Sequence, residues 1–571
     1  MIKNINKPGK YLLIYIFVSF CLWSFVFRDL IQNISYNLVD WRDYSYYIWV
    51  INQAIGNFKE LGVNGLFNGN AFYPLEGILL FSDLLWPQAL ITFIYSFFAS
   101  NIITQFNLMF LTTLGLNTLA IYFFWGTIFK EKLNVLFSSL ITNFSQIFFL
   151  ELNHLQMISY WPFFISLHYL FKEKKKIRDL FITGIFLSLQ FYASVYWTIF
   201  LLTVIIIYYL VRLAKKDNYF VLIKELLTIG TLFLILVGPI YFKYSEVKLA
   251  YNIERHYHEY VNYSAHLSDY FFNGAYETTL TQLSIFEKIN DYNKHYSFSA
   301  TIIIYVLSII GIFTLSKKKN YLSVELSLKK IDLIFLFITL LGFIFSLGPR
   351  LSFNGSYLGI PLPFIIALKY LIIFEPIRAT ARFSALFYFG LTYFSVKGLN
   401  KINKKNSSLI VILALLIFFL EIIPTNFKSE ANNYYPISYQ AIEEQCSKSM
   451  VLLEYPFEQD SKGANILTNL KYKASQLTAS VNHECNLVNG YAGFDPQEYI
   501  DYIHQFNNSL ETTNSATLNH IIKQKEIDFI KVNKNYLSDE KIMQIENINL
   551  KNDFGEIIYD DEDQFILKIR N

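Results

Sequence analysis

Residues 179–212 read DLFITGIFLSLQFYASVYWTIFLLTVIIIYYLVR, and no charged residue stands between Asp179 and Arg212. At about 1.5 Å per residue, one helix of this length would be much longer than the roughly 30 Å hydrocarbon core of a bilayer. The stretch therefore predicts two membrane-spanning helices. We place the break between them near Tyr196.

The rest of the sequence shares this apolar character. Of its 571 residues, 53% are hydrophobic, 18% are aromatic and 16% are charged, whereas ordinary soluble domains have about 25% charged residues. The mean hydropathy is +0.32. This composition predicts a polytopic α-helical membrane protein and excludes a disordered chain. The net charge of +3 is too small to indicate a nucleic-acid partner.

Eleven apolar runs are long enough, or nearly so, to cross a membrane. Clusters of Lys and Arg flank them, and the preference of these residues for cytoplasmic loops predicts a cytoplasmic N-terminus and an outward-facing C-terminal part. We therefore expect about eleven spans in the cytoplasmic (plasma) membrane. The runs are residues 11–27, 105–129, 134–150, 157–171, 179–195, 197–212, 220–241, 298–316, 331–347, 383–398 and 408–423.

The segment 77–99 is also apolar, but counting it as a span would place the basic cluster at 172–178 on the outer side. We therefore expect it to lie in the membrane interface or to re-enter the membrane. Asp83 and Pro87 within the segment favour this interpretation. The alternative is that it crosses the membrane and that a neighbouring run does not.

The composition changes near residue 424. From Thr425 onward the long apolar runs stop and charges become frequent. The sequence predicts a membrane domain over 1–423 and a small extracytoplasmic α/β domain over 424–571. Short apolar segments read as strands of this second domain, namely 450–457, 528–533, 556–559 and 565–569.

The three cysteines are too few for a disulfide scaffold and too dispersed for a zinc site. Cys21 lies in an apolar run, whereas Cys446 and Cys485 lie in the polar C-terminal part. These two could form a disulfide in an oxidising compartment. Two buried thiols are the alternative.

Two carboxylates follow the first apolar run. Asp40 and Asp43 have the i, i+3 spacing of residues on one helical face, and aromatic residues typical of a membrane interface come directly after them. A carboxylate held there can act as a general base towards a hydroxyl group. The alternative is that one of them caps a helix or pairs with Arg42.

Two arginines precede a late span. Arg378 and Arg382 have the i, i+4 spacing of one helical face, and two guanidinium groups together could bind a phosphate. The alternative is that these side chains extend to the interface, as arginines at helix ends often do. A third polar group is the turn that contains Glu151, His154 and Gln156, although a lone histidine is more often structural.

Several motifs occur together in a fixed order. They resemble the GT-C superfamily of membrane glycosyltransferases, above all its prokaryotic members, and are similar to aminoarabinose and protein O-mannosyl transferases. Two elements depart from the family pattern, since His266 replaces an acidic residue and the order around Arg378 is altered. The motifs lie at 40–49, 73–77, 154–156, 264–267, 375–383, 451–456 and 489–491.

The resemblance implies a sugar donor linked to polyprenyl phosphate, used on the outer face of the membrane. The acceptor would be an envelope glycan, a glycolipid or a protein, and the displacement would invert the anomeric centre. Membrane lipid is the other expected partner. No cofactor and no protein metal site are predicted, and the sequence leaves open whether a divalent metal ion assists.

The resemblance also assigns roles to residues. Asp40 would be the leading catalytic base and Asp43 the second choice. Arg378 and Arg382 would bind the donor phosphate. The residues that would orient the substrates are His154, Gln156 and Tyr73.

Two other functions remain possible on the sequence alone. A carrier that flips a lipid-linked saccharide would need charged groups along its spans, and the predicted spans are nearly free of charge. A catalytically inactive scaffold with the same fold is the second alternative. Motifs for ATP binding and for serine hydrolysis are absent from the sequence.

Overall fold

The computed structural model describes residues 9–60, 65–271, 278, 298, 300–320, 323–326, 329–403, 408–431, 438–443, 445–458, 466–512, 514–552 and 555–570. The chain divides into two compact units, and neither is continuous in sequence. Unit 1 contains Met1–Gln32, Phe110–Pro239 and Arg255–Lys428, and unit 2 contains Asn33–Met109, Ile240–Glu254 and Ser429–Asn571. The predicted domains, 1–423 and 424–571, stay a prediction.

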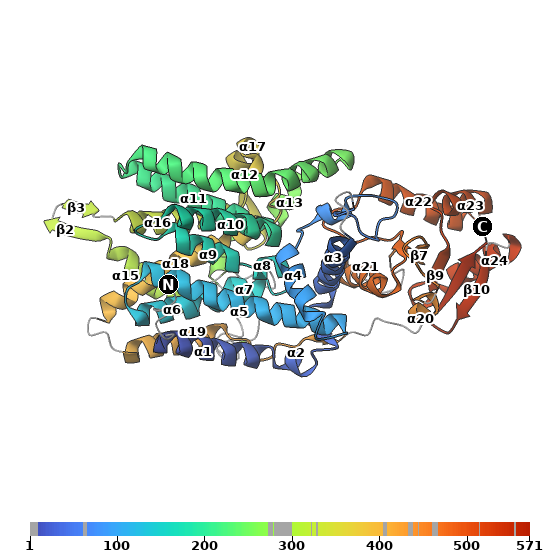
Figure 1. Ribbon diagram of the computed structural model, residues 1–571, viewed down its shortest axis with the longest axis horizontal. Coiled ribbons are helices and arrows are strands. Elements are labelled where there is room, and N and C mark those ends of the chain that lie inside the picture. Colours follow the sequence, from blue (N-terminus) through green and yellow to red (C-terminus); the bar gives the residue numbers. More distant parts are fainter. Residues whose placement is uncertain are drawn as a thin grey trace. The chain divides into compact units, whose positions relative to one another are not determined.

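Unit 1 is built mainly from helices (Figure 1). Two hairpins, β2–β3 and β4–β5, connect some of them, over Ser316–Asn320 with Ser323–Leu326 and Arg350–Phe353 with Ser356–Pro361. The helices that lie wholly in unit 1 are α1 (Lys10–Val26), α2 (Arg28–Gln32), α6 (Lys132–Asn143), α7 (Gln146–Leu150), α8 (Leu155–Ile158), α9 (Trp161–Leu170), α10 (Ile177–Ala193), α11 (Val195–Ala214), α13 (Tyr257–Asn262), η2 (Leu267–Tyr270), α15 (Ile302–Phe313), α16 (Lys330–Ser346), α17 (Phe364–Tyr370), η3 (Ile372–Phe374), η4 (Thr380–Phe383), α18 (Ser384–Ile402) and α19 (Ser408–Ile422).

Helix α18 packs closely against α15 and α16. Small residues make this possible, because a Cβ on Gly311 would lie 1.9 Å from the carbonyl oxygen of Phe394, and one on Gly398 would lie 1.9 Å from that of Leu307. A Cβ on Gly390 would meet the Thr339 hydroxyl of α16 in the same way. Close helix contacts through glycine are typical of membrane helices, where packing replaces the hydrophobic effect.

In the described residues, each of the eleven predicted apolar runs contains a helix or parts of two helices. The break predicted near Tyr196 is confirmed at Ser194, whose hydroxyl accepts the backbone N–H of Trp197 at the start of α11. By length and composition, four helices in the described residues are able to cross a membrane, and three shorter ones are apolar as well. The number of spans stays a prediction. The four are Ile102–Ile128 (α5), Lys132–Leu150, Val195–Ala214 and Tyr219–Ala250 (α12).

The segment 77–99 does not form one continuous helix. It contains the 3-10 turn η1 (Ile78–Phe81) and the ten-residue helix α4 (Trp86–Tyr95). At about 1.5 Å per residue, α4 is only about half as long as the hydrocarbon core is thick. This geometry agrees with the interfacial or re-entrant placement, which stays a prediction.

Unit 2 combines α3 (Trp41–Glu60), α4 and a five-stranded sheet with the order β10-β11-β9-β7-β8. Strand β7 pairs in parallel with β8 and β9, and β11 pairs antiparallel with β9 and β10. The short strands β1 (Asn37–Leu38) and β6 (Glu430–Ala431) form a separate pair. The sheet strands are β7 (Val451–Tyr455), β8 (Asn486–Leu487), β9 (Phe529–Asn533), β10 (Gly555–Asp560) and β11 (Gln564–Ile569).

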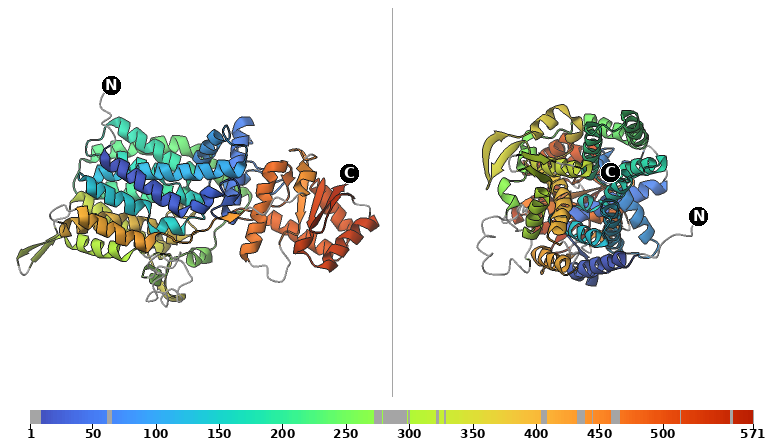
Figure 2. Two further views of the ribbon diagram at one scale, coloured as in Figure 1. Left: turned by 90° about the horizontal axis from the view of Figure 1, so that it is seen from below. Right: turned by 90° about the vertical axis from the view of Figure 1, so that its left-hand side faces the viewer.

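Helices cover both faces of this sheet (Figure 2). Alternate residues of β7 and β9, such as Leu453 and Ile530, join an apolar core that includes α22, α23 and α24. The residues between them, Glu454 and Lys531, contact Tyr439 of α20 on the other face. The four predicted strands are therefore confirmed. The helices are α20 (Ser438–Glu443), α21 (Ile466–His483), α22 (Gln497–Glu511), α23 (Ser515–Gln524), η5 (Lys534–Tyr536) and α24 (Asp539–Asn552).

Candidate functional site

In unit 2, Asp40 lies directly before the first residue of α3. Its Oδ1 atom accepts the backbone N–H of Asp43 at 2.9 Å, which is the contact of an N-cap residue. The expectation that Asp40 and Asp43 share a helical face is therefore wrong, because the helix begins at Trp41 and only Asp43 belongs to it. Both structural alternatives are present, because Asp40 caps the helix and Asp43 pairs with Arg42.

Asp43 is bound by two neighbours. Arg42 donates to both of its carboxylate oxygens, at 3.0 and 3.1 Å, and the hydroxyl of Tyr491 donates to Oδ1 at 3.2 Å. Asp40, in contrast, accepts only the Asp43 N–H among the described residues, and the Arg42 Nε atom is 4.0 Å away. The Asp40 side chain is 13% exposed. Asp40 thus keeps more capacity to bind a further proton donor than Asp43 does.

Burial raises the pKa of the Asp40 carboxyl above its ordinary value. The hydrogen bond from Asp43 and the charge of Arg42 act in the opposite direction, whereas the charges of Asp43 and Glu430 add to the rise. A raised pKa makes a carboxylate a stronger base once it is ionised. The environment of Asp40 is therefore suited to accepting a proton.

A second acidic residue holds the same end of α3. Glu430 accepts the backbone N–H of Trp41 at 2.8 Å and pairs with Lys471 of α21 at 2.7 Å. The indole N–H of Trp41 donates to Ser475, also on α21. Two carboxylates, Asp40 and Glu430, thus bind the first free N–H groups of the helix, where the helix dipole favours negative charge.

Tyr73 lies elsewhere in unit 2. Its hydroxyl donates to Glu526 at 3.3 Å, its backbone N–H donates to the Leu487 carbonyl, and its ring packs beside the apolar core of the C-terminal sheet. These contacts join the segment around Tyr73 to the sheet. The substrate-orienting role of Tyr73 stays a prediction, and no contact in the described residues connects this side chain to Asp40 or Asp43.

In unit 1, Arg382 forms a buried ion pair with Glu151. The Arg382 atoms Nε and Nη2 each lie 3.0 Å from Glu151 Oε2. The Arg382 guanidinium also stacks on Tyr196, 4.5 Å from the centroid of its ring. His154 Nδ1 lies 3.0 Å from the same carboxylate oxygen. Burial would raise the pKa of the Glu151 carboxyl, but the charges of Arg382 and His154 outweigh it and hold the pKa well below its usual range.

Arg378 and Arg382 do not lie on one helical face, which corrects the expectation from their spacing. Arg378 precedes the 3-10 turn η4, and α18 begins only at Ser384. The half-buried Arg378 guanidinium lies 4.8 Å from the ring centroid of Tyr263, in a different environment from the Arg382–Glu151 pair. An i, i+4 spacing brings side chains together only where the backbone is helical. Phosphate binding by either arginine stays a prediction.

Ser264, the first residue of the motif that resembles S-A-D-L, and the preceding Tyr263 contact the segment between Arg378 and Arg382. The Tyr263 carbonyl accepts the N–H of Ala381 at 3.1 Å, and the Ser264 hydroxyl lies 2.9 Å from that of Thr380. A Cβ on Gly348 would clash with Ser264. His266, which stands where the motif has an acidic residue, accepts the backbone N–H of Gly355 through its Nδ1 atom at 3.1 Å.

Gln156 lies in the short helix α8, directly after His154. It is buried, and within the described residues its Oε1 atom has no hydrogen-bond partner. A buried polar atom without a partner is costly unless a ligand or water binds it. This is consistent with the substrate-orienting role predicted for Gln156, which stays a prediction.

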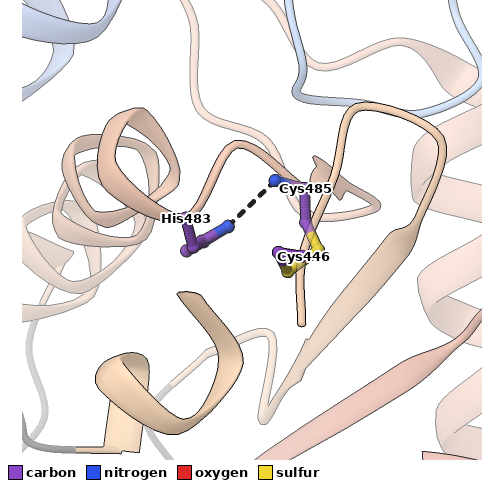
Figure 3. Close-up of side chains that lie close together, drawn as sticks. All are labelled: Cys446, His483 and Cys485. Carbon is purple, nitrogen blue, oxygen red and sulfur yellow. Dashed lines mark hydrogen bonds between the residues drawn. A yellow bond between two sulfur atoms is a disulfide. The ribbon is translucent and has the colours of Figure 1, made fainter. Parts of the chain in front are cut away.

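Cys446 and Cys485 form a disulfide, so the disulfide alternative is the one present (Figure 3). His483 Nδ1 accepts the backbone N–H of Cys485 at 3.2 Å. Cys446, His483 and Cys485 lie close enough together to hold a metal ion. In the described residues, no other group of three or more His, Cys, Asp or Glu side chains does so. The bonded sulfur atoms offer no thiolate, and the buried His483 is neutral because burial and Lys531 lower its pKa to about 3.

The sequence-predicted residues therefore form two separate groups. Asp40, Asp43 and Tyr73 belong to unit 2, and the arginines, His154 and Gln156 belong to unit 1. Their meeting in one pocket stays a prediction. Sequence reasoning missed the contact of Tyr491 with Asp43, although the N-G-Y motif that contains Tyr491 was a signal for it. It also missed the rings of Tyr196 and Tyr263 that stack on the arginines, and a single sequence offers no signal for these.

The fold is shared with solved membrane glycosyltransferases. An arabinofuranosyltransferase, AftD from Mycobacteria, is similar with a TM-score of 0.57 and 10% identity, over 98% of this chain and 40% of that one. The oligosaccharyltransferase of Archaeoglobus fulgidus, tethered with an acceptor peptide containing the NVT sequon, is similar with a TM-score of 0.50 and 12% sequence identity. The similarity covers 92% of this chain and 69% of that one. The protein is thus a polytopic helical membrane protein with the GT-C fold.

The sequence also places the chain in a family. Residues 59–422, more than half of the chain, match the model described as Domain of unknown function (DUF6311), and the chain belongs to this family. No curated protein matches the sequence. The chain spans less than half the length of AftD. The similarity to AftD therefore concerns the fold and does not identify the substrates of this chain.

Proposed function

We propose that the protein is an inverting membrane glycosyltransferase. It would transfer a sugar from a polyprenyl-phosphate-linked donor to a hydroxyl group of an envelope glycan, a glycolipid or a protein. The observation that carries the proposal is Asp40, a mostly buried carboxylate with a raised pKa and a single hydrogen bond in the described residues. The GT-C fold and the activities named for AftD and the oligosaccharyltransferase support it.

In the proposed reaction, the acceptor hydroxyl oxygen attacks the anomeric carbon of the donor from the face opposite the phosphate. The bond between that carbon and the phosphate oxygen breaks, and polyprenyl phosphate leaves with the bonding electrons. Asp40 takes the hydroxyl proton as the new glycosidic bond forms. Attack from the opposite face inverts the anomeric centre.

The arginine segment of unit 1 would stabilise the leaving phosphate. Arg378 is the better placed of the two arginines, because the charge of Arg382 is already neutralised by Glu151. Arginine suits this role, since its planar fork matches phosphate oxygens. His154 and Gln156 would orient the sugar or the acceptor. No metal ion is required by these steps.

We further propose that the protein lies in the cytoplasmic membrane with its N-terminus in the cytoplasm. The part from residue 424 onward would be extracytoplasmic. The disulfide between Cys446 and Cys485 supports this orientation, because disulfides persist in oxidising compartments and are rare in the cytosol. The donor and acceptor would then be used at the outer face.

The test uses the full chain in nanodiscs with radiolabelled polyprenyl-phosphate sugars and an acceptor extract from the envelope. Transfer and release of polyprenyl phosphate are measured for the wild type, Asp40→Asn and Glu60→Gln, which changes an exposed acid at the far end of α3. We expect Asp40→Asn to lose about 100-fold to 10,000-fold of the transfer rate while it still binds the donor, since this is the usual contribution of a general base. Glu60→Gln should retain the wild-type rate.

Two outcomes would contradict the proposal. Full turnover in Asp40→Asn would remove the proposed base. Donor binding without any turnover in the wild type would favour a lipid-linked saccharide carrier or an inactive scaffold with the GT-C fold.

A further inference from the structure

The hydroxyl of Tyr491 contacts Asp43, one of the two candidate carboxylates, from a distant part of the sequence. It donates to Asp43, 448 positions earlier in the chain, and its ring packs edge-on against Tyr46 of α3, with the centroids 5.6 Å apart. Tyr491 is the residue after Gly490 in the N-G-Y motif. The C-terminal part of unit 2 therefore contributes a polar group directly beside the candidate base.

Asn489 fixes the position of this tyrosine. Its side chain accepts the backbone N–H of Glu454 on β7 and donates to the carbonyl of the same residue, both at 2.8 Å. Its own carbonyl accepts the N–H of Phe72 at 3.0 Å. The ring of Phe72 lies so close to Gly490 that a Cβ there would be 2.3 Å from it. The loop is thus held by the sheet on one side and by Phe72 on the other.

We propose that Tyr491 is a positioning residue of the candidate site: together with Arg42 it binds the Asp43 carboxylate, so that Asp40 alone is left to accept a proton. The inference rests on the proposed function and extends it, because it makes the C-terminal part of the chain a component of the catalytic centre. Tyr491 does not touch the reacting atoms in this scheme. It acts through Asp43.

The charges around Asp40 explain why the hydrogen bond from Tyr491 to Asp43 affects the pKa of Asp40. Asp40 is faced by Arg42, which is attractive, and by two negative groups, Asp43 and Glu430. Lys471 pairs with Glu430, Arg42 pairs with Asp43, and the Tyr491 hydroxyl donates a hydrogen bond to Asp43. Removing the Tyr491 hydroxyl leaves the negative charge of Asp43 less screened. This charge raises the pKa of Asp40, so that less of it is ionised at a given pH.

The first test measures Asp40 without any substrate. Dicyclohexylcarbodiimide reacts with protonated carboxyl groups, and mass spectrometry of the full chain gives the fraction of Asp40 labelled at each pH. In Tyr491→Phe, which keeps the ring contact with Tyr46, we expect the midpoint of labelling to rise by about half a pH unit. The matched control is Tyr499→Phe, which removes a hydroxyl that binds the Gly490 N–H in the same loop.

A double-mutant cycle tests whether Tyr491 acts through Asp43. Asp43→Asn removes the negative neighbour, and the Asp40 midpoint should fall. Adding Tyr491→Phe to Asp43→Asn should then leave the midpoint unchanged. An unshifted midpoint in Tyr491→Phe, an equal shift in Tyr499→Phe, or a full further shift in the double variant would overturn the proposal.

The transfer assay supplies a second readout. In Tyr491→Phe we expect the acid limb of the pH profile to move up by the same half unit, so that kcat at a pH below the Asp40 midpoint falls about threefold while KM for the donor is unchanged. The labelling result does not depend on turnover. If the wild type transfers no sugar, the proposed function fails while the labelling still tests the effect of Tyr491 on Asp40.

Discussion

Each unit contains a buried cluster made of the same four kinds of side chain: a glutamate, a cation, a tyrosine ring and a histidine. In both clusters the cation pairs with the glutamate and lies over the tyrosine ring. The histidines differ. In unit 1 the members are Glu151, Arg382, Tyr196 and His154, and in unit 2 they are Glu454, Lys531, Tyr439 and His483.

Exposure separates the two clusters. The His154 side chain is 30% exposed and contacts Glu151, whereas His483 is 1% exposed and stacks on Tyr439 without touching the carboxylate. Lys531 lies near His483 and lowers its pKa, so that the imidazole stays neutral. The cluster of unit 1 therefore has a member that reaches solvent and can meet a ligand, while the cluster of unit 2 is enclosed and structural.

The largest expected effect comes from breaking the enclosed pair. Glu454→Gln leaves Lys531 buried without its counter-ion, and removal of one partner of a buried ion pair usually costs about 3–5 kcal/mol. The free energy of local unfolding of β9, measured by amide hydrogen exchange, should fall by this amount. The control Glu556→Gln on the exposed β10 strand should change it by less than about 0.5 kcal/mol.

The paired change Glu454→Leu with Lys531→Met sharpens this prediction. It removes both charges and should recover most of the lost stability, because apolar replacements of similar size often equal a buried ion pair. Equal exchange in Glu454→Gln and the wild type would show that the pair is not enclosed as described.

A smaller effect is expected from acidification. The pKa of His483 is about 3 in the folded chain, and about 6.5 when unfolded. Protonation therefore favours the unfolded state, so stability is unaffected above pH 6.5 and is lost as the pH falls from 6.5 towards 3. At pH 5 the end of α21 and β8 should have lost about 2 kcal/mol.

Amide hydrogen exchange at pH 7 and pH 5, corrected for the intrinsic exchange rate, measures this loss. His483→Gln cannot gain the proton and should lose much less between the two pH values. The same pH dependence in the variant would assign the loss to other groups.

The helices were largely predictable from the sequence because their signal is local. Runs of mostly apolar residues with few charges predicted these eleven helical regions, and Ser194, a good N-cap residue, lies two positions from the predicted break near Tyr196. The C-terminal strands were predictable for the same reason. The division into two units was not predictable, because residues 33–109 and 429–571 join through contacts between distant segments, such as the hydrogen bond of the Tyr73 N–H with Leu487 of β8.

The candidate site was predictable in its residue types and less so in its geometry. Both spacing arguments assumed a continuous helix, yet α3 begins one residue after Asp40, and a 3-10 turn separates Arg378 from α18. A helix boundary depends on capping contacts, and these need residues such as Glu430 that are hundreds of positions away. The pairing of Arg382 with Glu151 is equally non-local.

The smallest stability effect should come from His154, which makes it the sharpest test of the difference between the clusters. A partly exposed contact of this kind is worth up to about 1 kcal/mol, so His154→Ala should change the local stability of α7 and α8 by no more than this, as measured by hydrogen exchange. If His154 orients a substrate, the same variant should lose about tenfold or more in transfer rate. His483→Ala, in contrast, leaves a cavity in an enclosed cluster and should cost about 2 kcal/mol or more. A loss of stability in His154→Ala as large as in His483→Ala would mean that both histidines are structural, and the open cluster would then lose its distinction from the closed one.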